Sequence, residues 1–243
     1  MILLKGDCLV EMQNIPDDSV DLILTDPPYG TTACKWDSVI PFKPMWKQLN
    51  RIIKSNGAIV LFGSEPFSSA LRMSNIKNYK YDWVWEKQQG TGHLNAKKQP
   101  LRKTENISVF YKKQCLYNPQ MVGSETRVVK RNGKKSKNEN YSEHIEIPES
   151  TYVGRYPTNI INEKTPKTGI HPTQKPIALM EYLIKTYTNE GESVLDFTMG
   201  SGSTGVACKN LNRDFIGIEL DETYFNIAKN RIENHIVQTE LFK

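Results

Sequence analysis

The fold class follows from one stretch of the sequence, Val194-Leu195-Asp196-Phe197-Thr198-Met199-Gly200-Ser201-Gly202-Ser203-Thr204-Gly205. Its first residues are apolar and predict a buried strand, and the residues after the glycines predict a helix. Glycines between them let the backbone turn tightly and approach a ligand closely. Glu219 ends the next predicted strand, where a carboxylate can accept hydrogen bonds from ribose hydroxyls. This order of elements predicts a site for an adenosine-bearing ligand.

The residue before the glycine loop narrows the class of ligand. Asp196 stands at the predicted strand end, where a carboxylate disfavours a pyrophosphate and favours a cationic group. S-adenosylmethionine carries an ammonium and a sulfonium but no phosphate, so it suits this position better than a dinucleotide. The alternative is that Gly200 and Gly202 serve only the packing of the helix on the strand.

Short apolar runs elsewhere in the chain alternate with amphipathic segments. Strands are expected at residues 2–4, 20–25, 58–62, 81–85, 107–111, 193–196 and 215–218. Helices are expected at residues 44–54, 176–187, 203–211 and 221–236, the first of them capped by Asn56-Gly57. Nearly all-apolar strands that alternate with helices predict an α/β fold with a doubly wound, mostly parallel seven-stranded sheet covered on both faces.

Composition excludes several classes of protein. The 243 residues include 38% hydrophobic and 24% charged side chains, which is typical of a globular chain. No apolar run approaches the roughly 20 residues of a membrane span, and the first residues lack the pattern of a signal peptide. The four cysteines are far apart without a C-x-x-C pair, which disfavours disulfides and a cysteine zinc site. We therefore expect a cytoplasmic protein without a metal.

The net charge of +5 is unevenly distributed. Residues 86–139 hold 13 basic and 4 acidic side chains, while the remainder holds 19 basic and 23 acidic side chains. A localised basic segment is the expected footprint of a protein that binds nucleic acid. The alternative on charge alone is a solvated loop.

A second motif, Thr25-Asp26-Pro27-Pro28-Tyr29-Gly30, follows the apolar strand at residues 20–25. The prolines end the strand and contribute no N–H group, so the turn presents carbonyl acceptors beside the Asp26 carboxylate and the Tyr29 ring. Such a group can hold a planar ring that carries an exocyclic amine. The alternative is an ordinary rigid turn.

With these motifs, the chain resembles the S-adenosylmethionine-dependent DNA adenine-N6 methyltransferases. The resemblance rests on Asp26-Pro27-Pro28-Tyr29, the glycine loop, Gly6-Asp7-Cys8 and His171-Pro172-Thr173-Gln174-Lys175-Pro176. The order, with the Asp-Pro-Pro-Tyr motif first, is that of the β group, whose catalytic domain is circularly permuted. It implies a Rossmann-like methyltransferase fold in which the glycine-loop strand neighbours the Asp-Pro-Pro-Tyr strand.

The resemblance also implies roles for individual residues. Asp26, Pro27, Pro28 and Tyr29 would form the catalytic motif, with Asp26 and the Pro27 carbonyl accepting from the target amine while Tyr29 stacks on the base. Asp7 would contact the cofactor's adenine and Glu219 its ribose, while Asp196, Gly200, Gly202, Thr173 and Lys175 would surround its methionine portion. The full implied cofactor set is Asp7, Cys8, Asp26, His171, Thr173, Lys175, Asp196, Phe197, Gly200, Ser201, Gly202, Ser203, Thr204 and Glu219.

One departure from the family pattern concerns the aromatic contact with the cofactor. The family usually reads Asp-Pro-Phe before its glycines, whereas this chain reads Asp196-Phe197-Thr198. Phe197 either takes over the aromatic contact or points into the core.

The resemblance further divides the chain and suggests its partners. Residues 1–111 and 171–243 would form the two parts of the catalytic domain, and residues 112–170 a loop-rich target-recognition insertion. Double-stranded DNA is the expected partner, and a homodimer and a cognate restriction endonuclease are further expectations. The expected product of the cofactor is S-adenosylhomocysteine. DNA contacts are expected from Lys97, Lys98, Arg102, Lys103, Arg127, Lys130, Arg131, Lys134 and Lys135.

Two other functions stay open at this point. A related amine methyltransferase would act on cytosine N4, RNA adenine or protein glutamine, although the family's cytosine enzymes usually carry Ser, and its glutamine enzymes Asn, in place of Asp26. A catalytically silent DNA-binding module is the other alternative, against which the intact Asp26, Tyr29 and glycines count.

Overall fold

The computed structural model of the chain describes residues 1–31, 37–129, 150–164 and 174–237. The chain forms two compact units. The larger combines Met1–Asn118 with Asn159–Lys243, and the smaller is Pro119–Thr158.

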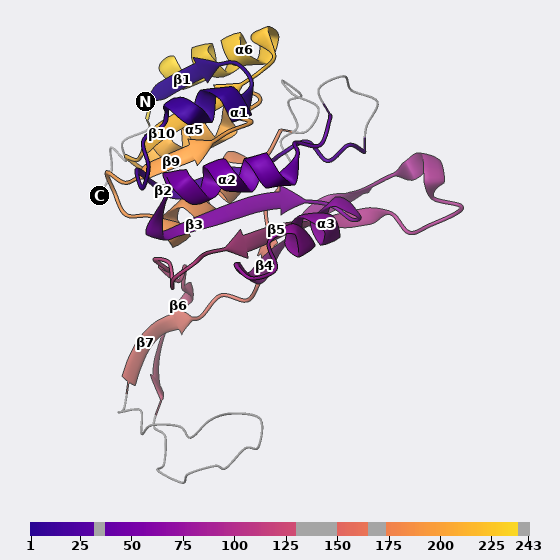
Figure 1. Cartoon of the computed structure of the whole chain (residues 1–243). Helices are drawn as coiled ribbons and strands as arrows, with labels where there is room; N and C mark the ends of the chain where they lie inside the picture. The colour runs from indigo at the N-terminus through magenta and orange to yellow at the C-terminus, as the bar shows by residue number, and fades with distance from the viewer. Residues whose placement is uncertain (32–36, 130–149, 165–173, 238–243) are drawn as a thin grey trace. The chain divides into compact units, whose positions relative to one another are not determined.

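The larger unit is built on an eight-stranded sheet with the order β1-β10-β9-β2-β3-β5-β4-β8 (Figure 1). The strands from β1 to β3 in that order pair in parallel, whereas β5 runs antiparallel to both β3 and β4, and β8 is parallel to β4. The strands are β1 (Ile2–Lys5), β2 (Val20–Thr25), β3 (Ile53–Gly63), β4 (Tyr79–Thr91), β5 (Arg102–Phe110), β8 (Ile160–Asn162), β9 (Ser193–Asp196) and β10 (Asp214–Glu219).

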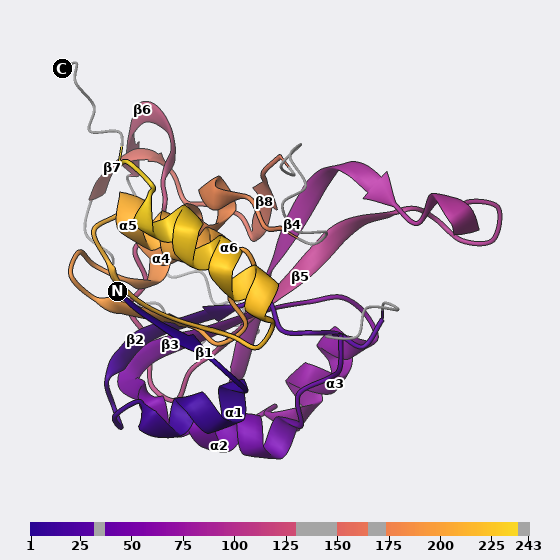
Figure 2. The ribbon, with the colours of Figure 1, turned by 90° about the horizontal axis from the view of Figure 1, so that it is seen from above.

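Helices cover both faces of this sheet. Figure 2 shows α1, α2 and α3 on one face and α4, α5 and α6 on the other. The helices are α1 (Cys8–Glu11), α2 (Phe42–Ile52), α3 (Phe67–Ser74), α4 (Ile177–Tyr187), α5 (Ser203–Asn210) and α6 (Glu222–Glu233). Short 3-10 turns occur at Met12–Asn14 and His93–Asn95.

Because helices pack on both faces of the sheet, the central strand β2 carries three consecutive apolar residues, Leu22-Ile23-Leu24. Leu22 and Leu24 of β2 pack in the cluster that contains Leu183 of α4, whereas Ile23 packs in the cluster that contains Leu49 of α2. Successive side chains of a strand point to opposite faces. Because both faces are covered, each of these residues loses its contact with water, which stabilises the fold by about 1.5–3 kcal/mol per side chain.

The predicted α/β sheet is confirmed, with three differences. All seven predicted strands form, but an eighth, β8, was missed because a three-residue strand has almost no periodic signal. The helix predicted over residues 44–54 ends at Ile52, and β3 begins at Ile53. Gly57 therefore lies in a strand and is no helix cap; a Cβ there would come 2.7 Å from the Asp21 carbonyl oxygen. Helices α1 and α3 were not predicted.

The smaller unit contains an antiparallel pair, β6 (Val122–Val129) and β7 (Ser150–Arg155). The unit lies within the segment at residues 112–170 that was predicted to be a loop-rich insertion, and its two strands were not among the predicted strands. β8 also comes from that stretch but belongs to the main sheet. Within the described ranges, no helix is long and apolar enough to cross a membrane.

Candidate active site

Four carboxylates singled out from the sequence lie at the ends of four neighbouring parallel strands. Asp7 follows β1, Glu219 ends β10, Asp196 ends β9 and Asp26 follows β2. The sheet order β1-β10-β9-β2 places these strands side by side. In doubly wound sheets, ligands bind in the crevice outside the carboxyl ends of the strands.

The Asp-Pro-Pro-Tyr motif and the glycine loop contact each other directly. β2 pairs with β9 through Leu22 and Ile23, which confirms that the two motif-bearing strands are neighbours. Beyond the strands, the Thr198 hydroxyl donates to the Asp26 carbonyl oxygen at 3.0 Å, and the Phe197 N–H donates to Thr25 Oγ1 at 3.1 Å. Any ligand at the glycine loop therefore lies beside the Asp26 turn.

The glycine loop has a backbone conformation that other residues rarely adopt. Gly200 and Gly202 have φ values of 51° and 78°, in the left-handed region that favours glycine. A Cβ at Gly202 would also lie 3.0 Å from Cβ of Ala228. The N–H of Gly200 donates to Glu219 Oε2 at 2.8 Å. Because that N–H is engaged with a carboxylate, it is not presented to a phosphate.

The carboxylates at this edge are held by local donors. Glu219 also accepts from the Asp221 N–H at 2.9 Å; burial raises its pKa, and these backbone donors oppose the shift. Asp196 accepts from Thr204 Oγ1 at 2.5 Å and from the Thr198 N–H at 3.2 Å. Burial raises the pKa of Asp196 to about 7. A carboxyl that titrates near neutrality is poised to respond to a cationic ligand.

Other predicted cofactor residues take different positions around this edge. Asp7 is exposed and caps α1 by accepting from the Leu9 N–H at 2.8 Å. Cys8 is buried, and burial raises the pKa of its thiol to about 12. Phe197 is buried in the cluster that includes Leu195, which answers the open question of its direction: it packs in the core.

The residues at the start of α5, which were also predicted to bind the cofactor, are buried. They are Ser201, Ser203 and Thr204. Arg231 of α6 donates to the Ser201 carbonyl oxygen at 3.0 Å and to Ser203 Oγ at 3.3 Å. These contacts tie the glycine loop to α6.

Asp26 is the centre of a compact polar cluster. The Tyr29 hydroxyl donates to Asp26 Oδ1, and the Lys175 ammonium donates to Asp26 Oδ2 at 2.5 Å. Burial raises the pKa of Asp26, while the Lys175 charge opposes that rise. Burial also raises the pKa of Tyr29 well above its ordinary value, so the phenol stays protonated and keeps donating. The Tyr29 ring packs 5.1 Å from the Phe67 ring.

Lys175 was expected beside the methionine portion of the cofactor, and the structure places its ammonium on Asp26. It is 6% exposed and lies between two carboxylates, with Glu105 Oε2 at 3.3 Å. On its other side, Glu105 forms an ion pair with Lys87. The result is an alternating row of charges, Asp26, Lys175, Glu105 and Lys87.

Glu105 and Lys87 were not predicted as site residues. A signal for Glu105 exists in the sequence, since Glu105, Ile107 and Val109 alternate along β5 and share one face. Ile107 and Val109 are fully buried, so the acid two positions before Ile107 faces the core. Its partner could not be read from the sequence.

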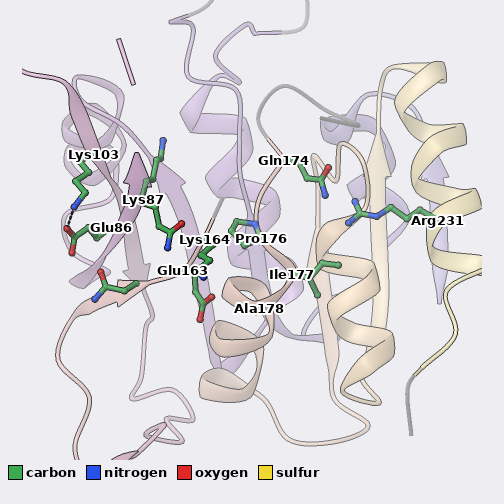
Figure 3. A pocket seen from close by; sticks show the side chains of 12 residues that line it. Glu86, Lys87, Lys103, Glu163, Lys164, Gln174, Pro176, Ile177, Ala178 and Arg231 are labelled. Carbon is green, nitrogen blue, oxygen red and sulfur yellow. Dashed lines mark hydrogen bonds and ion pairs between the residues drawn. The ribbon is translucent and has the colours of Figure 1, made fainter. Parts of the chain in front are cut away.

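Lys87, the last residue of this row, also lines a cavity of about 700 Å³ (Figure 3). It lies among β4, β5, the residues around β8, the start of α4, and Arg231 of α6. Four of its lining side chains are basic, Lys87, Lys103, Lys164 and Arg231, against two acidic ones, Glu86 and Glu163. An excess of positive charge favours an anionic ligand.

The predicted DNA contacts are distributed over both units. Lys97 and Lys98 are exposed at the tip of the β4–β5 hairpin. Arg102 donates to Ser64 Oγ, and Lys103 pairs with Glu86 at 2.7 Å, so both hold intramolecular partners. Arg127 lies on β6. The predicted residues that fall outside the described ranges are Lys130, Arg131, Lys134, Lys135, His171 and Thr173.

Comparison with known proteins identifies the family. Residues 20–230 match the DNA methylase family. The chain belongs to this family. A Type II methyltransferase of Streptococcus pneumoniae, M2.DpnII, is 30% identical over 96% of this chain and 90% of its own length. The DNA adenine methyltransferase YhdJ of Escherichia coli is 28% identical over 99% of this chain and 86% of its own length.

Solved structures agree with this assignment. The crystal structure of the M1.HpyAVI–SAM complex is 30% identical, with a TM-score of 0.64 over 95% of this methylase and 98% of that chain. The cytosine-N4-specific PvuII DNA methyltransferase, at 16% identity and a TM-score of 0.69 over 96% of this chain and 87% of its own, shares the fold. The site described above therefore belongs to a methylase.

Proposed function

We propose that this methylase transfers a methyl group from S-adenosylmethionine to N6 of adenine in double-stranded DNA. The main support for the proposal is that the Asp-Pro-Pro-Tyr turn and the glycine loop are in direct contact. The Asp26 turn, rich in acceptors, is hydrogen-bonded to the glycine loop through Thr198, so an amine at Asp26 would lie next to a ligand at the loop.

The residues at the sheet edge fit a cationic, phosphate-free cofactor. Asp7, Asp196 and Glu219 contribute carboxylates, and the Gly200 N–H is engaged with Glu219. Glu219 would hold the ribose and Asp196 the amino-acid portion, with the buried residues at the start of α5 closing the site. When bound, S-adenosylmethionine supplies an electrophilic methyl group on a sulfonium.

The chain's own residues make the amine a better nucleophile. The N6 lone pair of adenine is conjugated with the ring. Asp26 and the Pro27 carbonyl would accept the two N–H bonds, which favours a pyramidal nitrogen and stabilises the positive charge that develops on it. Each Asp26 oxygen keeps a further lone pair beside the Tyr29 and Lys175 bonds.

The proton balance needs no strong base before the methyl group moves. The nitrogen–carbon bond forms while the sulfur–carbon bond breaks, and the sulfur keeps the electron pair. The methylated amine is then acidic and loses its proton to water. Asp26 therefore acts as an acceptor and orienting group, and holding the amine in line supplies further acceleration.

The target amine lies inside the duplex, so the base must be flipped, which costs a few kcal/mol. Tyr29, half-buried beside Phe67, would stack on the flipped base. Lys97 and Lys98 at the exposed hairpin tip would contact backbone phosphates. The insertion at residues 112–170 would recognise the target sequence through basic residues such as Lys130 and Lys134.

Adenine is favoured over cytosine N4 by Asp26, since the family's cytosine enzymes usually carry Ser at that position. A silent DNA-binding module would have no need of a carboxylate so closely held among donors. We also propose a cytoplasmic enzyme that acts with a cognate restriction endonuclease and forms a homodimer.

Nucleoside analysis tests this function. Purified protein, S-adenosylmethionine with a labelled methyl group and bacterial genomic DNA are incubated, and the DNA is digested to nucleosides. Label in N6-methyladenine is expected, and none from the Asp26→Ala variant. Label in N4-methylcytosine, or in no nucleoside, would overturn the proposal.

A further inference from the structure

Lys175 stands out because a buried ammonium is costly unless it is paired and hydrogen-bonded. Here it lies 2.5 Å from Asp26 Oδ2 and 3.3 Å from Glu105 Oε2, and 5.1 Å from the centre of the Phe62 ring. It comes from the segment just before α4, far from both carboxylates in the sequence. Three separate parts of the chain thus converge on one charge.

Asp26 needs this charge to work as an acceptor. An enclosed carboxyl without a cation tends to take up a proton, and the neighbouring Asp196 illustrates the tendency, because burial raises its pKa to about 7. A protonated Asp26 would itself be a donor and would offer the target amine fewer lone pairs.

In the described part of the chain, charged and titratable groups from several elements face Asp26. Tyr29 donates to it from the same turn, Lys175 pairs with it from the start of α4, and Glu105 on β5 repels it. Asp196 adds a second repulsion from β9. Lys87 on β4 neutralises Glu105 from the far side. Among the residues that the structure describes, Lys175 is the cation in direct contact with Asp26.

We propose that Lys175 is a positioning residue for methyl transfer, which keeps Asp26 ionised and oriented as the acceptor of the target amine. Glu105, which is itself paired with Lys87, offsets part of the positive charge of Lys175. The proposal rests on the proposed function of Asp26. It assigns Lys175 to the reacting amine's side of the site instead of the cofactor's methionine portion.

The two neighbours of Asp26 predict opposite effects on the pH dependence of the reaction. In Lys175→Gln, Asp26 loses its cation, so the acid limb of the single-turnover methylation rate should move up by about one pH unit or more. In Glu105→Gln, Asp26 loses a repelling charge and Lys175 has one carboxylate fewer to share, so the limb should move down. Lys175→Arg keeps the cation and should restore a profile near that of wild type.

The experiment measures the single-turnover rate from pH 5 to pH 9 on duplex DNA at saturating S-adenosylmethionine, together with cofactor affinity. Lys54→Gln is the matched control, because it breaks an Asp21–Lys54 ion pair of 2.7 Å at the opposite end of β2 and should leave the profile in place. Cofactor affinity in Lys175→Gln should stay near that of wild type.

Several results would overturn the role. They are a Lys175→Gln profile that is only lower and not shifted, a shift in the same direction for both variants, or a loss of cofactor binding without a shift. If Lys175→Gln fails to fold, the Glu105→Gln variant tests the proposal alone: a downward shift of the acid limb supports the role of Lys175, and an upward shift or no shift contradicts it. A wild-type protein that makes no N6-methyladenine would contradict the proposed function itself; an active wild type with unshifted variants would contradict only the role of Lys175.

Discussion

The Thr198 hydroxyl donates a 3.0 Å hydrogen bond to the backbone carbonyl of Asp26, although 172 positions separate the two residues in the sequence. The bond joins the loop expected to hold the methyl donor to the turn expected to hold the methyl acceptor. Because in-line transfer depends on the distance between donor and acceptor, we expect this bond to matter for rate more than for stability.

Thr198→Val removes the bond and keeps the shape of the side chain. We expect the single-turnover rate to fall by roughly tenfold, equivalent to about 1.4 kcal/mol in the barrier, with a loss of about 1 kcal/mol in unfolding free energy. Thr186→Val is a matched control, since the buried Thr186 hydroxyl donates to the Tyr182 carbonyl at 2.7 Å on α4. In this control the unfolding free energy should fall by a similar amount, and the single-turnover rate should not change. Equal rate losses in both variants would contradict this reading.

Asp26→Ala removes the acceptor from the reacting amine. Turnover should fall by at least about 100-fold, the usual effect of deleting a preorganised group at a transition state. Cofactor affinity, measured by calorimetry, should change little. The control is Asp214→Ala, which changes an exposed acid on β10. Wild-type turnover in Asp26→Ala would remove Asp26 from the mechanism.

Asp196 predicts a pH dependence of cofactor binding. Its pKa of about 7 in the free protein means that the carboxyl is largely protonated at pH 6 and largely ionised at pH 8. Because the ionised form attracts a cationic ligand, affinity for S-adenosylmethionine should rise with pH through about 7 and then level off, with proton release on binding near neutrality. Calorimetry in buffers of different ionisation enthalpy measures both effects. In Asp196→Asn the affinity should be lower and nearly independent of pH; an unchanged pH dependence would assign the titration to another group.

The hairpin tip predicts a salt dependence of DNA binding. If Lys97 and Lys98 each neutralise a phosphate, the double alanine variant should reduce the slope of log affinity against log salt by about 2. Lys229→Ala changes an exposed lysine on α6 and should leave the slope unchanged. Lys130 and Lys134 of the insertion should each act like the hairpin lysines. A slope that stays at its wild-type value in the hairpin variant would place the phosphates elsewhere.

The sequence was sufficient for the parts of the site that follow directly from strand ends. Asp7, Asp26, Asp196 and Glu219 each close or follow an apolar run, and parallel strands bring such residues to one edge whatever their order along the chain. That β2 and β9 are neighbours in the sheet was expected from the resemblance to the family, whose fold places the two motif-bearing strands side by side.

The rest depends on tertiary contacts that have no local signature. Lys175, Glu105 and Lys87 come from three segments whose convergence on Asp26 depends on the packing of β4, β5 and α4. The end of α2 at Ile52 was misjudged because Asn56-Gly57 looks like a helix cap, whereas Gly57 is required by the close approach of Asp21.

The most direct test of the central claim is methylation of unmodified genomic DNA by the purified protein, followed by single-molecule sequencing. This measurement reports the modified base, its position and the surrounding sequence together. N6-methyladenine at one recurring sequence is the predicted result. N4-methylcytosine at the modified positions, or DNA without any mark, would contradict the account.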